Sequence, residues 1–344
     1  MSKLLDRLAA GPVICAEGYL FEFERRGYLQ AGAFVPEVVL EEPALVADLH
    51  RQFVHAGSDV VEAFTYYAHR EKLALIGREG DLELMNRQAL KIAKEVAAEH
   101  DSLVAGNICN TNIYEPDDPA THGLVRDMFT EQVGWAAEAG VDFVIAETIS
   151  YAQEALLALE VIKEAGLDAV ITMAVHREPA TREGWPVGET LRRIEDAGAA
   201  VVGLNCMRGP RTMLPLLGEI RDACQGHIAA LPVPYRTTEA EPTFSALTDP
   251  DCDVIPDDRP FPVALDPFTC NRYEMGAFAK AAHDMGVTYL GVCCGAGPHH
   301  IRSVAEALGR TPPASRFSAD MSRHAYFGTN ERISSVNQEY SSKL

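Results

Sequence analysis

Eight short apolar runs recur along the chain, and each is followed by a longer segment in which apolar residues recur at helical spacing. The runs are rich in Val, Ile, Leu, Ala and Phe, as expected of strands buried on both faces. Eight strand–helix units in one α/β chain predict a (β/α)8 barrel, or TIM barrel. The expected strands are residues 12–16, 59–64, 103–108, 143–147, 169–174, 200–205, 228–232 and 289–293.

An open, doubly wound sheet is the alternative fold. It usually has fewer strands and often carries a Gly-x-Gly-x-x-Gly turn after its first strand, which this sequence lacks. Several of the helical segments end in a small residue and glycine just before the next strand, which suits a helix C-terminus. The expected helices are residues 43–55, 84–100, 125–139, 151–165, 188–197, 212–224, 273–285 and 299–308.

Two segments fall outside this repeat. Residues 235–262 are rich in Pro and Asp and precede the eighth strand, and a loop of that length is more often functional or interfacial than a simple connector. Residues 311–344 are polar and cannot add a further unit. We therefore expect a barrel over residues 1–310 and a C-terminal arm over residues 311–344.

The balance of charges restricts the partners. A formal charge of −20 argues against nucleic acid or an anionic membrane surface, because both recruit basic patches. No run of eighteen apolar residues is present, and Asp6 and Arg7 interrupt any signal-like stretch at the N-terminus. We expect a cytoplasmic protein whose eight cysteines stay reduced.

Three of the cysteines stand at the ends of two expected strands. Cys206 ends the sixth strand, and Cys293 and Cys294 end the eighth. Strand carboxyl ends share the working face of such a barrel, so the three thiolates can converge on one Zn²⁺ and leave a fourth position open. Both adjacent cysteines can bind only if the strand ends there. The alternatives are packing residues or a redox pair.

The residues around these cysteines resemble the two zinc-binding signatures of the homocysteine S-methyltransferase family. The matching segments are GLNC (203–206) and GVCCGAGPHHIRSVAEAL (291–308), with further similarity at 24–43, 49–68, 142–148 and 266–272. The chain is most similar to the betaine-using branch. The resemblance implies a (β/α)8 fold, one zinc ion held by Cys206, Cys293 and Cys294, and methyl transfer to homocysteine, giving methionine.

The resemblance also implies the acceptor site. In the family, the glutamate that matches Glu147 holds the ammonium group of homocysteine. Glu147 comes at the end of the expected fourth strand. Family members usually end the first strand in Asp-Gly-Gly, whereas this chain has Ala16, Glu17 and Gly18, so only Gly18 matches directly. Whether Glu17 replaces the aspartate is open. The two histidines at 299 and 300 open the last helix, where capping and packing are expected.

A positively charged onium donor is bound best by aromatic faces. Tyr67 matches an aromatic residue that lines the donor pocket in betaine-using members of the family. Phe34 stands where those members usually have Trp, and Thr148 stands where they have Tyr. Other aromatics expected at the mouth are Tyr19, Phe21 and Tyr66, and Arg208 or Arg272 is a candidate for the donor carboxylate. The expected donor is a small onium carboxylate of the betaine type.

Two other functions remain open at this point. The methyl group could come from another donor, either S-methylmethionine or a corrinoid partner protein, or the zinc could be purely structural in a non-catalytic protein. Structural zinc is normally closed by four ligands, which argues against the last. Similar enzymes use a longer C-terminal extension to assemble, so the arm predicts a homodimer or homotetramer.

Overall fold

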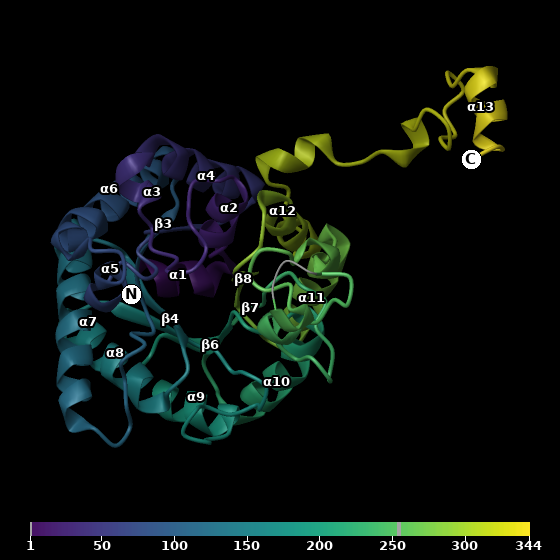
Figure 1. Ribbon diagram of the computed structural model, residues 1–344. Coiled ribbons are helices and arrows are strands. Elements are labelled where there is room, and N and C mark those ends of the chain that lie inside the picture. The colour runs from purple at the N-terminus through teal and green to yellow at the C-terminus, as the bar shows by residue number, and fades with distance from the viewer. Residues whose placement is uncertain (1, 253–255) are drawn as a thin grey trace.

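The computed structural model describes residues 2–252 and 256–344. Eight parallel strands form a closed barrel in chain order, and β1 pairs with both β2 and β8. The predicted (β/α)8 barrel is thus confirmed (Figure 1). The strands are β1 (Val13–Ala16), β2 (Val60–Glu62), β3 (Leu103–Cys109), β4 (Phe143–Ile149), β5 (Asp168–Met173), β6 (Val201–Asn205), β7 (His227–Leu231) and β8 (Tyr289–Val292).

The helices that follow the strands form the outer ring of the barrel (Figure 1). Their bounds agree with the predicted segments to within two residues, except that α7 begins six residues early. There the Asp118 side chain accepts a hydrogen bond from Ala120 N–H and Pro119 opens the helix. The ring is α4 (Pro43–Ala56), α6 (Leu82–His100), α7 (Pro119–Ala139), α8 (Ala152–Glu164), α9 (Val187–Asp196), α10 (Pro210–Ala223), α11 (Arg272–Asp284) and α12 (Pro298–Ala307).

The N-terminal helix α1 (Lys3–Ala10) was not predicted. Its buried Leu4 and Leu8 belong to one apolar cluster with side chains from the barrel interior, including Val13 and Tyr289. Lys3 pairs with Asp142, just before β4, so α1 covers the amino ends of the strands. A site for small molecules is therefore left to the opposite face, where the strands end.

Short helices fill the connections at that face. The first connection holds α2 (Tyr19–Arg25) and α3 (Val38–Glu41), and the second holds α5 (Arg70–Ala74) and η1 (Glu79–Asp81). The long excursion at 235–262 contains η2 (Phe244–Ala246) and η3 (Pro256–Asp258), and its residues 253–255 lie outside the described residues. It is followed by η4 (Asp266–Phe268). Phe244 and Phe261 of the excursion pack against Phe21 of α2, which places the excursion over the mouth.

The C-terminal segment leaves the barrel after α12 and carries η5 (Pro313–Phe317), η6 (Met321–Arg323) and α13 (Ser335–Ser341). Figure 1 shows this arm extending away from the ring, with α13 standing clear of it. The first part stays near the barrel, where Arg302 of α12 donates a hydrogen bond to Ser318. Among the residues described, no helix combines the length and apolar character needed to cross a membrane.

Candidate active site

The three predicted cysteines meet at the mouth of the barrel. Their sulfur atoms all lie within 4.8 Å of one another, and those of Cys293 and Cys294 are 3.8 Å apart. β8 ends at Val292, before both adjacent cysteines, so the alternation of a strand does not separate them. Cys206 directly follows β6 and has a φ of 58°, which turns the chain sharply at the strand end. The structure thus brings Cys206 next to a cysteine pair that begins 87 residues later in the sequence.

The thiols differ in their acidity. Hydrogen bonds from Cys293 and then Cys294 hold the pKa of Cys206 well below its usual range, whereas burial raises the pKa of Cys293. A thiolate held beside two further sulfurs is the kind of donor set that a soft divalent cation selects. The cluster can therefore hold a metal ion.

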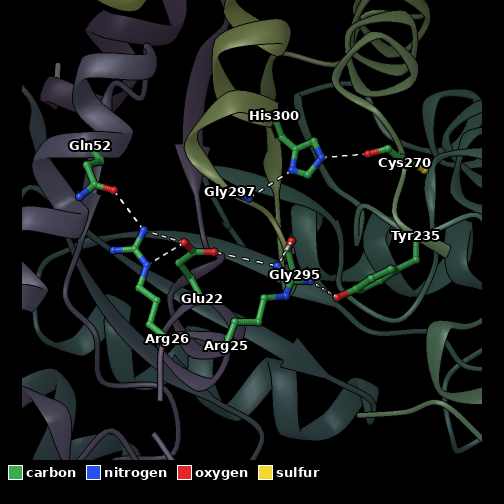
Figure 2. A network of polar contacts seen from close by, with 9 residues as sticks. All are labelled: Glu22, Arg25, Arg26, Gln52, Tyr235, Cys270, Gly295, Gly297 and His300. Carbon is green, nitrogen blue, oxygen red and sulfur yellow. Dashed lines mark hydrogen bonds and ion pairs between the residues drawn. The ribbon is translucent and has the colours of Figure 1, made fainter. Parts of the chain in front are cut away.

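A polar network fixes the loop that follows the cysteine pair (Figure 2). Arg25 of α2 donates to the carbonyl oxygen of Gly295 at 2.9 Å and to the Tyr235 hydroxyl at 2.8 Å. Gly295 has a φ of +94°, and a Cβ there would lie 2.3 Å from the Tyr235 hydroxyl, so glycine is required. Groups that orient a metal-binding loop in this way set the position of its ligands.

The histidines at the start of α12 act as expected. His300 Nδ1 accepts a hydrogen bond from Gly297 N–H at 3.1 Å, and its Nε2 lies 3.0 Å from the carbonyl oxygen of Cys270 (Figure 2). His299 packs on it, with ring centroids 4.0 Å apart. Both rings serve the helix start rather than the cysteine cluster.

Glu147 lies inside the barrel mouth, close to the cysteines. The register between β4 and β5 shifts between Ala146 and Ile149, and Glu147 stands within this irregularity. Its carboxylate accepts hydrogen bonds from the Nδ2 of Asn107 at 2.7 Å and of Asn205 at 2.8 Å. Burial raises the pKa of Glu147 to about 8. A cation at this carboxylate would offset the cost of its burial.

Two further carboxylates surround Glu147. Glu17 accepts from Asn205 at 3.2 Å, and Asn107 donates to Glu62, so the two asparagines link all three acids. Burial, followed by the negative charge of Glu147, raises the pKa of Glu17 and of Glu62 well above the usual range. Among residues 2–252 and 256–344, no hydrogen-bond partner reaches the buried Glu17 Oε1 and Glu62 Oε2. The group is thus short of positive charge.

Gly18 lies beside the same loop. A Cβ at this position would be 2.6 Å from the carbonyl oxygen of Ala296, so the backbone of the first strand's end can approach that loop only as glycine. The structure therefore places Glu17, Gly18 and Glu147 around one spot next to Cys293. Sequence reasoning missed Glu62, Asn107 and Asn205, although each is a polar residue inside an expected apolar strand.

A cavity of about 290 Å³ opens beside Cys206 and Cys294. Aromatic side chains line much of it. Phe21, Phe34, Tyr66 and Tyr67 were expected at the mouth, and the others are Tyr114, Tyr151, Phe244 and Phe261. The backbone N–H of Tyr67 donates to Cys109 Sγ at 3.2 Å, which fixes the residue in its left-handed conformation. One face of the Tyr67 ring already holds the Lys72 ammonium, 4.0 Å from the ring centroid.

Three expected cavity residues lie elsewhere. Tyr19 packs edge-on against His50 and Phe53 and borders a smaller pocket of the mouth, the one lined by the buried glutamates. Arg208 donates to the backbone carbonyls of His176 and Arg177 and is therefore used inside the fold. Arg272 lies against the exposed Tyr273 ring, at 5.0 Å, outside the lining of the cavity. Neither arginine lines the cavity, so the structure gives no support to the prediction that one of them meets the donor carboxylate.

Comparison with known proteins is consistent with this geometry. A sequence model described as homocysteine S-methyltransferase matches residues 18–308. The chain belongs to the homocysteine S-methyltransferase family. The resemblance seen in the sequence is thereby confirmed, together with the expected enzyme class, an S-methyltransferase.

Individual relatives cover most of the chain. It is 36% identical over 324 residues to the rat S-methylmethionine–homocysteine S-methyltransferase BHMT2, covering 91% of this chain and 84% of that protein. It is 35% identical to betaine–homocysteine S-methyltransferase 1 of Xenopus laevis, covering 89% of this chain and 75% of that protein. The metallated form of the Escherichia coli homocysteine methyltransferase MmuM shares the fold, with a TM-score of 0.67 at 16% identity over 88% of this chain and 98% of that one.

Proposed function

We propose that this protein transfers a methyl group from a small onium compound of the betaine type to the thiol of homocysteine, giving methionine. The observation that carries the proposal is the convergence of three cysteine sulfurs with Glu147 at a barrel mouth, beside an aromatic cavity. The names of the relatives support homocysteine as the acceptor, because both betaine-using and S-methylmethionine-using relatives share it.

The proposed cofactor is one zinc ion held by Cys206, Cys293 and Cys294. These residues fit the ion because their sulfurs are close together at strand ends fixed by the fold, and the group they form has three members. A three-ligand site is typical of catalytic zinc, since it leaves a coordination position open. When bound there, zinc lowers the pKa of a coordinating thiol and so supplies a thiolate nucleophile at neutral pH.

Glu147 is proposed to bind the ammonium group of homocysteine. Its carboxylate is held by Asn107 and Asn205 and faces no cation within the described residues. An ammonium group in this position would form charge-assisted hydrogen bonds and favour the ionised carboxylate. Glu17 adds negative charge to the same place, and the Gly18 backbone borders it. The acceptor would thus be oriented by its amino group.

The aromatic cavity is proposed to bind the methyl donor. The ring faces of Phe34 and Tyr67 would contact the onium group, at about 0.5–2 kcal/mol for each contact. As the bond from the homocysteine sulfur to the methyl carbon forms, the bond from that carbon to the onium atom breaks, and the donor leaves as a neutral amine or thioether. A site with little water favours a step in which opposite charges merge.

The donor itself is best tested directly. We expect methionine to form from homocysteine with glycine betaine, proline betaine or dimethylsulfoniopropionate, and a chelator to abolish turnover. S-methylmethionine is the second onium candidate, because a relative that is 36% identical to this chain is named for that donor. Methyl-corrinoid completes the panel. Methionine formation from the corrinoid alone would show that the aromatic cavity does not bind an onium donor.

Metal content tests the cysteine assignment. The purified protein should contain one zinc ion per chain, and Cys206→Ala, Cys293→Ala and Cys294→Ala should each lose most of it when dialysed against a chelator. Cys224→Ala is the matched control, because Cys224 is also buried but lies at the end of α10, outside the cluster. Retention of zinc by all three site variants would contradict the assignment.

Removal of the Glu147 charge tests the acceptor site. Glu147→Gln should weaken homocysteine binding about tenfold or more, because a hydrogen bond between charged groups is worth about 1.5–3 kcal/mol. Calorimetric titration measures the affinity, and zinc content shows whether the metal site is intact. The control is Glu178→Gln, which removes an exposed glutamate. An unchanged affinity in Glu147→Gln would show that the ammonium group binds elsewhere.

The C-terminal arm is proposed to mediate self-association as a homodimer or homotetramer. Apolar side chains lie exposed along it, among them Phe317, Phe327 and Tyr340. We expect light scattering at micromolar concentration to give at least a dimer, and Phe327→Ser with Tyr340→Ser to shift it toward monomer. Leu84→Ser on the ring should not, although Leu84 is 60% exposed. A monomeric full-length chain would contradict the proposal.

The cytoplasmic setting remains a proposal, consistent with eight unpaired thiols.

A further inference from the structure

The loop between β5 and α9 forms one wall of the aromatic cavity and is held firmly. Arg208 donates to the carbonyl oxygens of His176 at 2.7 Å and Arg177 at 2.8 Å, and Ala180 forms a bridge with Pro186. The backbone N–H of Arg182 donates to the carbonyl oxygen of Ser150 at 2.9 Å, just after β4. These bonds fix the backbone that carries Arg182 before any ligand binds.

Arg182 is the one Lys or Arg side chain among the described residues that line the cavity. Its guanidinium lies 5.7 Å from the centroid of the Tyr151 ring, and no ion pair or side-chain hydrogen bond engages it within the described part of the chain. The nearby His176 contacts the Ser150 hydroxyl at 3.0 Å, and burial lowers its pKa, so it adds no charge at neutral pH.

The remaining charges of the wall are negative. Glu154 is buried and accepts hydrogen bonds from the N–H and the hydroxyl of Thr111, at 2.8 Å and 2.6 Å, and Glu115 also lines the cavity. An anionic group that enters the cavity is repelled by these two carboxylates and attracted by Arg182, whereas the Lys72 ammonium stays outside the lining, against the Tyr67 ring. The onium end of a zwitterion would avoid Arg182 and move toward the aromatic rings and the carboxylates.

We propose that Arg182 binds the carboxylate of the methyl donor, so that the protein selects onium compounds that carry a carboxylate. The inference rests on the proposed function and adds the element of the donor that the cavity recognises. A guanidinium can donate two parallel N–H bonds to a carboxylate, which orients the ligand as well as holding it. An anchored carboxylate would leave the onium methyl groups facing the cavity wall that contains Cys206 and Cys294.

Kinetics with paired donors tests this role. The donors with a carboxylate are glycine betaine and S-methylmethionine, and the donors without one are choline and trimethylsulfonium. Arg182→Gln should raise KM for the first pair about tenfold or more and leave kcat/KM for the second pair within about twofold. Arg182→Lys should lie in between, because lysine keeps the charge but loses the paired geometry. Arg177→Gln is the matched control, an exposed arginine of the same loop outside the cavity lining.

The two donor classes separate the possible outcomes. A loss confined to carboxylate donors supports the anchor, and the preserved turnover of the others shows that Arg182→Gln is folded. No change, or an equal change for all four donors, overturns it and leaves Arg182 as a residue that stacks on Tyr151. If none of the onium donors supports methylation of homocysteine by the wild-type protein, the proposed function fails. The anchor is then tested by calorimetric titration of glycine betaine, and it fails as well unless wild-type protein binds betaine and Arg182→Gln does not.

Discussion

The eight parallel strands close on themselves, so every strand delivers its carboxyl end to the same rim. Closure brings β8 next to β1, and it leaves only β7 between the strands that precede Cys206 and Cys293. Because α1 covers the opposite end, the rim is the one open face of the barrel interior in the described structure. The cysteine cluster, the buried carboxylates and the aromatic cavity all depend on this arrangement.

The polar centre of the rim is electrostatically incomplete. Three buried glutamates share two asparagines, and burial raises the pKa of each acid, so the protein alone does not stabilise their ionised forms. Such a group is costly in an apolar barrel unless a ligand completes it. A substrate with an ammonium group would supply the missing charge. Burial of the three glutamates would then explain both their cost to stability and their proposed use in binding.

The sequence was sufficient to predict the barrel, because strands buried on both faces and amphipathic helices leave strong periodic patterns. It also predicted the cysteine cluster, since strand ends must converge. Glu62, Asn107 and Asn205 left a weaker signal, because a polar residue in an apolar run does not reveal its partner. Arg182 and Arg208 lie in or beside irregular loops, where the spacing of residues in the sequence does not predict the direction of their side chains. Their places became clear only from the hydrogen bonds that hold the loop.

Three cysteine sulfurs are proposed to form a metal site open to the thiol of homocysteine. Cobalt(II) in place of zinc tests it most directly, because thiolate ligands give a charge-transfer band in the near ultraviolet whose strength follows the number of sulfurs bound. We predict saturation at one cobalt ion per chain, a thiolate band that is weaker or lost in Cys206→Ala, and a stronger band when homocysteine is added. A site without a thiolate band, or a band that homocysteine leaves unchanged, would contradict it.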